Sequence, residues 1–365
     1  MNGPDLLLPA PVQAAPLPEV RNHTPYPSQY FQMMDVGDEV FHVIASRITY
    51  DLTRLDEQGA PPLAAVQAPL VEADEFYGDP TSSSCIQESD FAPYKPKCDI
   101  ILAHAVAYAP EGKPHQRWPV GIRIGEWQKM LAVTGARYVD RGLLGWKVTE
   151  PQKATQVPLR WELAYGGSCQ WPRHLKEDEE PEIFKAFEAN PLGTGWTDKA
   201  WLKKAQVADV DAPQIEVFDQ PFGTEEANAM AYPAVGVGPV GKWWTPRRQK
   251  AGTYDQAWKE SRWPRLPLDF DFGYWNAAPE DQQIEYPQGG EELVLAGLTA
   301  GQQVWRCKLP SLRPFVRVRL QAGPILPRQM NLDTLVIDFK AGTLSCVHRM
   351  TLVARAEVRV LEICL

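Results

Sequence analysis

The chain has 365 residues, enough for one large domain or two smaller ones, and 44% of them are hydrophobic. This composition supports a buried core and excludes global disorder. The 46 acidic side chains outnumber the 37 basic ones, which gives a formal net charge of -9. Nucleic acids and anionic membranes are bound through clustered Lys and Arg, so we expect neither as a partner and favour a basic protein partner.

The cysteines and the N-terminus favour a cytoplasmic protein. No C-x-x-C pair occurs and the cysteine spacing is irregular, so we expect reduced thiols. No basic region precedes the short apolar run at residues 6–8, and no stretch approaches the ~20 apolar residues of a membrane span. The six cysteines are Cys85, Cys98, Cys169, Cys307, Cys346 and Cys364.

Proline and glycine set the organisation of the chain. The 34 prolines and 26 glycines interrupt every long helical pattern and favour short strands joined by turns. Residues 1–20 hold five prolines and are typical of an extended, polyproline-II-like tail. We expect residues 21–365 to form one β-rich domain, and a division into lobes at about 21–165 and 166–365 stays open.

The first half of the domain is predicted to be chiefly β, with helices after it. Residues 40–52, 100–108 and 159–165 have strand patterns bounded by turn formers. Short helices are predicted over 183–189 and 198–206. A third helix is predicted to start at a capping box of Thr253 and Gln256 and to stop before Pro264, with Tyr254 and Trp258 on one face.

The C-terminal part returns to strand patterns. Residues 340–343 are typical of a hairpin turn, and several arginines alternate with apolar residues, as in half-buried antiparallel strands. We therefore predict a mainly β (β-rich α+β) fold of antiparallel sheets or a barrel-like sandwich, with few short helices and long Pro/Gly-rich loops. The predicted strands cover 292–296, 303–309, 315–320, 334–339, 344–350 and 353–363, and the arginines are Arg317, Arg319, Arg355 and Arg359.

Catalytic patterns are weak in this chain. The serines at 82–84 lack a G-x-S-x-G elbow, and the glycine pairs at 166–167 and 236–238 complete no phosphate loop and favour close backbone approach instead. We predict no catalytic, cofactor-binding or metal-binding residue, since the six histidines are dispersed. A carbohydrate hydrolase stays the alternative, because Trp-rich clefts with paired acids cleave sugars. Its candidate acids are Glu162, Asp269 and Asp271.

Trp243 and Trp244 are the strongest candidates for a binding function. In an extended segment, adjacent side chains point to opposite faces, so one indole would anchor the core while the other reaches the surface. Arg247 follows closely, and Trp and Arg dominate protein interfaces. We therefore predict that Trp243, Trp244 and Arg247 contact a partner. The alternative is that they brace a loop-rich core.

A cluster of acidic residues is the second binding candidate. It would offer a docking face to a basic partner segment, although a charge run of this kind is more often a solvated loop. The cluster comprises Glu177, Asp178, Glu179, Glu180 and Glu182.

An ordered array of short motifs, which we call the family-like segments, extends over roughly residues 21–300. The most extensive one runs from Val237-Gly238-Pro239-Val240 through Lys242-Trp243-Trp244-Thr245-Pro246-Arg247 to Tyr274-Trp275-Asn276-Ala277-Ala278-Pro279 and Asp281-Gln282-Gln283. The others are Leu70-Val71-Glu72-Ala73-Asp74, Tyr77-Gly78-Asp79-Pro80, Glu88-Ser89-Asp90-Phe91-Ala92-Pro93-Tyr94-Lys95-Pro96, Ala107-Tyr108-Ala109-Pro110, Trp161-Glu162-Leu163-Ala164-Tyr165-Gly166-Gly167, Asn190-Pro191-Leu192-Gly193-Thr194-Gly195 and Gly289-Gly290-Glu291.

This array resembles the domain-of-unknown-function 2169 (DUF2169) family, whose bacterial members are implicated as adaptors that load toxic effectors onto the type VI secretion spike. The resemblance implies a noncatalytic adaptor or chaperone that binds an effector and promotes its loading onto the VgrG and PAAR proteins. It supplies no catalytic residue. A hydrolase and an exported structural component of the spike stay the alternatives.

Overall fold

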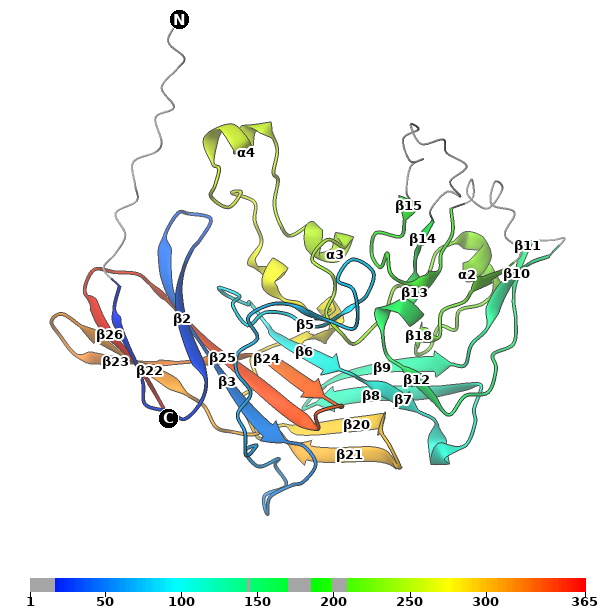
Figure 1. Cartoon of the computed structure of the whole chain (residues 1–365), viewed down its shortest axis with the longest axis horizontal. Coiled ribbons are helices and arrows are strands. Elements are labelled where there is room, and N and C mark those ends of the chain that lie inside the picture. The colour runs from blue at the N-terminus through cyan, green and yellow to red at the C-terminus, as the bar shows by residue number, and fades with distance from the viewer. Residues whose placement is uncertain (1–16, 143–144, 170–184, 199–208) are drawn as a thin grey trace, which may run out of the picture.

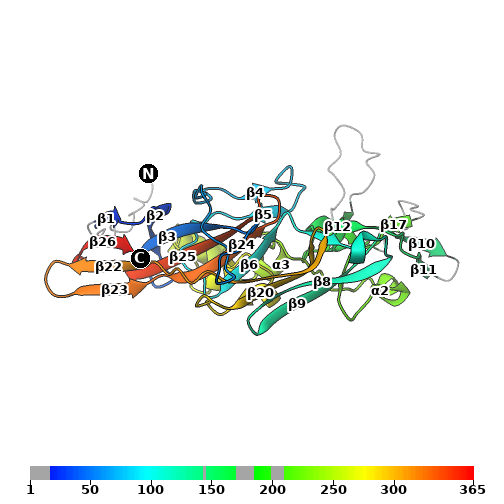
Figure 2. The same ribbon diagram turned by 90° about the horizontal axis from the view of Figure 1, so that it is seen from below.

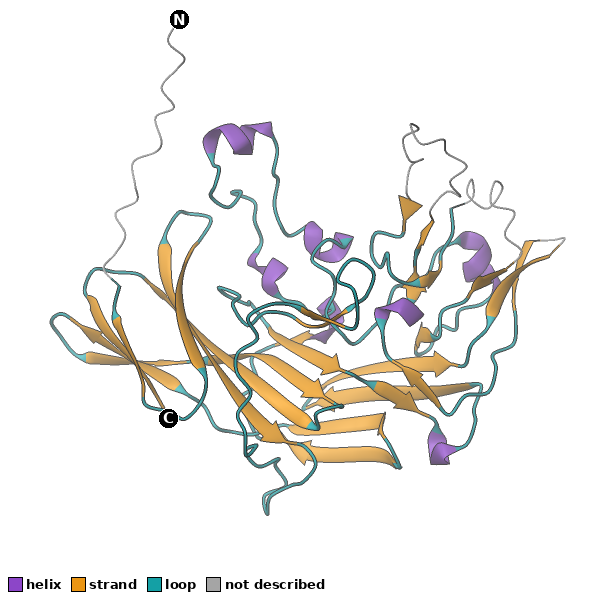
Figure 3. Cartoon of the chain, in the orientation of Figure 1, coloured by secondary structure: helices purple, strands orange, loops and turns teal. Residues whose placement is uncertain are grey.

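The computed structural model describes residues 17–142, 145–169, 185–198 and 209–365. Strands account for 42% of the structure and helices for 9%, which confirms the mainly β fold (Figure 3). Several sheets are antiparallel, and the described residues form no closed barrel. The described α-helices are α2 (Thr224–Ala229), α3 (Thr245–Arg248) and α4 (Gln256–Ser261), and the 3-10 helices are η1 (Pro110–Gly112), η2 (Trp161–Leu163), η3 (Phe272–Trp275) and η4 (Glu280–Gln282).

Two sheets packed face to face form the centre of the molecule (Figures 1 and 2). Alternate side chains of each sheet enter the shared core, where Ile100 and Leu102 of one sheet join Ile122 and Leu293 of the other. The six-stranded sheet has the order β19 (Gln283–Ile284), β6 (Cys98–Ala103), β24 (Asn331–Asp338), β25 (Thr343–Val353), β3 (Val40–Asp51) and β2 (Ser28–Met34). The five-stranded sheet has the order β18 (Ile215–Val217), β9 (Trp127–Thr134), β8 (Arg117–Ile124), β20 (Glu292–Thr299) and β21 (Gln302–Lys308).

A four-stranded sheet extends one end of the molecule. Its apolar side chains, including Val318 and Leu361, form a second core with Ile44 and Met350 of the six-stranded sheet. The order is β1 (Glu19–Asn22), β26 (Val358–Cys364), β22 (Phe315–Leu320) and β23 (Ile325–Gln329). Since β1 pairs with β26, regular structure begins slightly before the predicted end of the tail at residue 20, and residues 1–16 lie outside the described part.

Small sheets and α2 form the opposite end of the molecule (Figure 1). They enclose a third core in which Tyr165 packs against Phe187, Phe222 and Tyr232. The sheets at this end are β11 (Gly145–Val148), β10 (Tyr138–Gly142) and β17 (Asp209–Asp211); β13 (Tyr165–Gly166) with β16 (Thr194–Gly195); and β14 (Ser168–Cys169) with β15 (Lys185–Ala186). Two further pairs lie nearer the centre: β12 (Gln156–Pro158) with β7 (Val106–Tyr108), which contacts β20, and β4 (Glu75–Phe76) with β5 (Cys85–Gln87), which contacts β6.

Strands from both halves of the sequence share the two central sheets. β8 pairs with β20, and β6 pairs with β24. A division into lobes near residue 165 therefore does not separate the sheets. The predicted strand over 40–52 and most of the predicted C-terminal strands are confirmed, and the hairpin turn at 340–343 joins β24 to β25. The strand predicted over 353–363 begins only at Val358 as β26, because residues 354–357 form the turn that follows β25.

Two predicted elements have a different structure. The helix expected over 183–189 is contradicted by β15, which pairs with β14 while Phe187 packs against Tyr165, so pairing and aromatic packing override the local pattern. Within the expected strand over 159–165, Trp161–Leu163 forms η2. The helix expected over 198–206 falls almost entirely outside the described residues.

The third predicted helix exists as α4, but its N-cap is Asp255, whose carboxylate accepts a hydrogen bond from Trp258 N at 2.8 Å. The predicted cap Thr253 instead donates to Asp269 at 2.7 Å. Tyr254 and Trp258 do share a face, with ring centroids 4.7 Å apart. Tyr254 is exposed and Trp258 only partly buried, so this pair packs within the projecting α4 segment rather than in a core (Figure 1).

All six cysteines are buried and none is bonded to another. Burial raises the pKa of most of these thiols above the ordinary value, to about 12 for Cys307. Among the helices that the structure describes, none has the length and apolar character needed to cross a membrane.

Candidate functional site

A groove of about 1090 Å³, which we call the Trp243 groove, is built from stretches of chain that are distant in sequence. Its lining comes from residues 74–88, 185–196 and 241–248, with Ser168 of β14. Each of the three stretches contains a family-like segment: Asp74 and Glu88 belong to the first, Leu192 to the second and Trp243 to the third. The fold thus brings separate motifs to one surface.

The two adjacent tryptophans divide between core and surface, as predicted. Trp243 is 82% exposed at the groove, whereas Trp244 is 7% exposed and packs edge-to-face on Trp161 at 5.2 Å. The segment is a turn that leads into α3 rather than a strand, but the separation of the two indoles is the same. An indole this exposed stays available for a partner.

Glycines allow the backbone to lie against the two buried indoles. A Cβ at Gly236 would meet the Trp161 ring at 2.9 Å, and one at Gly241 would meet Trp244 Nε1 at 2.5 Å. The Trp161 indole also donates a hydrogen bond to Gly238 O at 3.2 Å. Glycine in this segment therefore serves close packing, as the sequence indicated.

Arg247 braces the groove from behind and does not face a partner. Its side chain is 4% exposed, pairs with the Glu88 carboxylate through two nitrogens, and donates to Val240 O at 2.8 Å and Tyr274 O at 2.7 Å. Burial lowers the pKa of Arg247, but Glu88 outweighs burial and raises it. The buried Arg247 therefore has a structural role instead of the predicted partner contact. The sequence did not indicate this role, because Glu88 lies 159 residues away along the chain.

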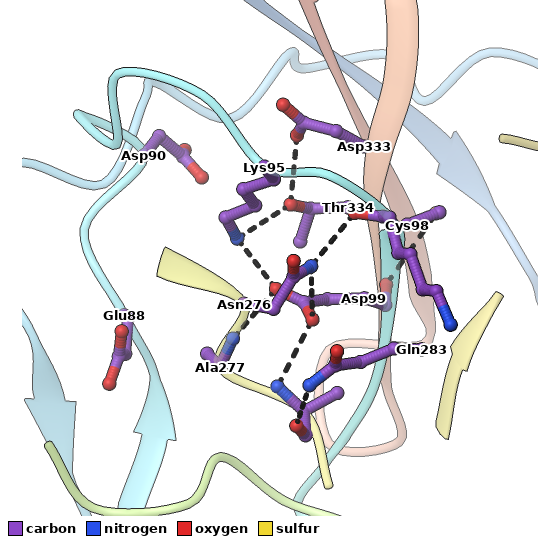
Figure 4. Close-up of polar contacts among 12 residues, drawn as sticks. Glu88, Asp90, Lys95, Cys98, Asp99, Asn276, Ala277, Gln283, Asp333 and Thr334 are labelled. Carbon is purple, nitrogen blue, oxygen red and sulfur yellow. Dashed lines mark hydrogen bonds and ion pairs between the residues drawn. The ribbon is translucent and has the colours of Figure 1, made fainter. Parts of the chain in front are cut away.

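Behind the groove, a buried carboxylate joins two of these family-like segments, the one that contains Lys95 and the one that contains Asn276 (Figure 4). Asp99 on β6 is fully buried and accepts hydrogen bonds from Lys95 Nζ at 2.8 Å and Asn276 Nδ2 at 3.0 Å. The backbone N–H groups of Ala277 and Ala278 donate to it at 2.9 and 3.2 Å. One side chain therefore fixes the segment around Asn276 against the central sheet.

The network continues through Lys95 to the neighbouring strands. Lys95 Nζ donates to Thr334 Oγ1 at 2.9 Å, the Thr334 hydroxyl lies 3.0 Å from Asp333, and Arg349 Nε donates to Asp333 at 2.6 Å. Burial lowers the pKa of Lys95, but the Asp99 and Asp333 carboxylates outweigh burial and raise it. These buried charges are paired with one another, an arrangement that favours a fixed platform behind the groove.

The charged groups at the groove are paired with one another. Lys242 Nζ lies 2.5 Å from Asp74, and Arg248 lies 2.7 Å from Glu188. The hydrogen bond from Thr245 and then the charge of Arg248 lower the pKa of Glu188. Trp243, rather than a free charge, is therefore the distinctive contact group of the groove.

The other predicted candidates are not brought together. Glu162 accepts two hydrogen bonds from Ser84, each at 2.7 Å, while Asp269 binds Thr253 and Asp271 caps η3. In the described ranges, no three His, Cys, Asp or Glu side chains cluster as a metal site requires. The acidic candidates lie outside the described residues; they are Glu177, Asp178, Glu179, Glu180 and Glu182.

Comparison with known proteins identifies the family. The family model described as "Uncharacterized protein conserved in bacteria (DUF2169)" matches residues 37–349. The chain belongs to the DUF2169 family. Neither a curated protein nor a solved structure matches it.

The groove of this DUF2169 chain includes residues that sequence reasoning did not select, among them Asp74, Glu188 and Leu192. Asp74 and Leu192 do belong to family-like segments, so a signal for their importance was present. The sequence held no signal that segments more than a hundred residues apart would meet. Only the fold shows that these motifs line one surface.

Proposed function

We propose that this DUF2169 chain is a noncatalytic adaptor that binds a type VI secretion effector and promotes its loading onto the VgrG and PAAR spike proteins. The link to type VI secretion rests on the resemblance of the family-like segments. The single observation that carries a binding function is the convergence of family-like segments from three distant stretches of the chain on a groove that presents the exposed Trp243.

The groove suits binding better than catalysis. A binding surface works best when its contact groups are held in place before the partner arrives. Arg247 and Glu88 fix the chain behind Trp243, and the buried network around Asp99 fixes the adjoining segment. Capture by such a preformed surface costs little conformational entropy, so an aromatic anchor there contributes most of its contact energy to affinity.

The proposal also covers where the adaptor acts and how its acidic cluster contributes to binding. The adaptor would act in the cytoplasm, before its cargo is secreted, and would leave the effector's chemistry to the effector. The acidic cluster from Glu177 to Glu182 would attract a basic effector segment and raise the association rate, in a salt-dependent way.

Affinity purification from the native bacterium tests this function. With the tagged full-length chain as bait, we expect an effector protein and VgrG or PAAR to be enriched over an unrelated tagged bait of similar charge. Repeating the capture at high salt should reduce the effector yield if the acidic cluster contributes, since exposed charges are screened over ~8 Å at physiological ionic strength. Recovery of neither an effector nor a spike protein would contradict the proposal.

A further inference from the structure

At the β2 end of the six-stranded sheet, one face is covered by the chain around residues 91–94 instead of a second sheet, and this leaves Val43 fully buried but Met33 and Phe41 partly exposed. Met33 lies opposite Phe41, and Val43 lies opposite Thr351, so these four side chains share one face. On the other face, Ile44 packs in the second core against the four-stranded sheet. The sheet is therefore covered by a second sheet on one side only at this end.

A cavity of about 360 Å³ lies on that face, and we call it the Met33 groove. Pro93, Tyr94 and Phe272 form its wall, with the Tyr94 and Phe272 rings 6.0 Å apart. Its lining is mostly apolar; the exceptions are Thr351 and Asp35, whose carboxylate accepts hydrogen bonds from the backbone N–H groups of Gly37 and Glu39. Methionine side chains adapt to partners of different shape. Cavities of this size hold several apolar side chains.

A smaller and strongly polar pocket of about 140 Å³ adjoins this groove, because Tyr94 and Thr351 line both. Arg349 also lines the polar pocket, but it is already paired with the buried Asp333. Arg328 of β23 lines it too, is exposed, and has no ion-pair partner among the residues that the structure describes. The polar pocket thus carries one uncompensated positive charge beside the apolar groove.

The surrounding surface extends this positive charge. Arg328 belongs to the four-stranded sheet, and residues 17–24, 313–330 and 354–365 that build that sheet and its turns hold seven arginines against three glutamates. Their net side-chain charge of +4 contrasts with the -9 of the whole chain. An acidic segment would be attracted to the four-stranded sheet, so its carboxylates would lie toward Arg328 and away from Asp35 at the groove.

We propose that the Met33 groove and the adjoining polar pocket form a second docking site, for an extended protein segment in which apolar side chains are followed by carboxylates. The apolar side chains would fill the groove, and a carboxylate would pair with Arg328. A protein segment fits better than a polyanion, because the cavity beside the charge is apolar. The site shares no lining residue with the Trp243 groove, so it stands independently of the proposed capture of an effector there.

Short synthetic peptides on an array, probed with the full-length chain, test this proposal. We expect binding to peptides that combine Leu, Met or Phe with Asp or Glu, and little binding when Lys or Arg replaces the acids. In solution, the best peptide should lose about tenfold or more in affinity with Arg328→Glu, which reverses an exposed charge, and with Met33→Asp. Thermal melts exclude unfolding of either variant.

Two matched controls separate this site from general charge effects. Lys308→Glu makes the same charge change at an exposed position of β21, and Trp243→Ala removes the indole of the other groove; both should retain the affinity. Preference for basic peptides, absence of binding, or unchanged affinity in Arg328→Glu would overturn the proposal. So would binding only to phosphatidylserine vesicles or single-stranded DNA.

Discussion

Replacing Arg247 with alanine should lower the free energy of unfolding by about 3 to 5 kcal/mol, because the substitution leaves the largely buried Glu88 carboxylate with only Lys242, 4.0 Å away, as a counter-ion. Glu88 has a side-chain exposure of 10% and would lose both of its bonds to the guanidinium. The carbonyl groups of Val240 and Tyr274 would also lose a donor. Urea unfolding of the purified chain measures the effect.

The adjacent residue provides the control for this prediction. Arg248 lies on the same short helix and pairs with Glu188, but its side chain is 53% exposed. Arg248→Ala should therefore cost about 1 kcal/mol or less. Equal losses in the two variants would contradict the structural role assigned to Arg247.

Replacing Asp99 with alanine should also cost about 3 to 5 kcal/mol, since four donors lose one common acceptor inside the protein. Lys95 would keep Thr334 as a partner but lose its nearest carboxylate. Asn276 would keep only the carbonyl of Lys97. Chemical denaturation again gives the free energy of unfolding.

Two further variants, Lys95→Met and Asp140→Ala, serve as comparisons for the unfolding measurement on Asp99→Ala. Lys95→Met should be milder than Asp99→Ala, because Asp99 would still accept bonds from Asn276 and two backbone N–H groups. Asp140 is an exposed strand residue, and its replacement should leave stability within about 0.5 kcal/mol. A loss below about 1 kcal/mol in Asp99→Ala would show that the network does not hold the fold together.

Local sequence patterns predicted the parts of this fold that depend on local interactions. Alternating and β-branched residues located β3 and the C-terminal strands, and the split between Trp243 and Trp244 followed from their adjacency. The helix expected over 183–189 was wrong because pairing of β15 with β14 outweighs the helical preference of a few residues.

The candidate site was predictable only in part, because it is assembled from long-range contacts. Arg247 meets Glu88 across 159 residues, and Asn276 meets Asp99 across 177. Neither pair has a spacing that a sequence pattern could indicate. The motifs marked the right segments, but an arginine that braces a buried acid and one that contacts a partner look alike in sequence.

The affinity of the purified chain for a captured effector, compared between wild type and Trp243→Ala, tests the central claim most directly. We predict that Trp243→Ala raises the dissociation constant by about tenfold or more, equivalent to ~1.4 kcal/mol, while the melting temperature stays unchanged. Trp263→Ala, at an indole that is 64% exposed in the segment after α4 and outside the groove, should leave the affinity unchanged. An unchanged dissociation constant in Trp243→Ala, with the protein folded, would contradict the assignment of this groove as the capture site.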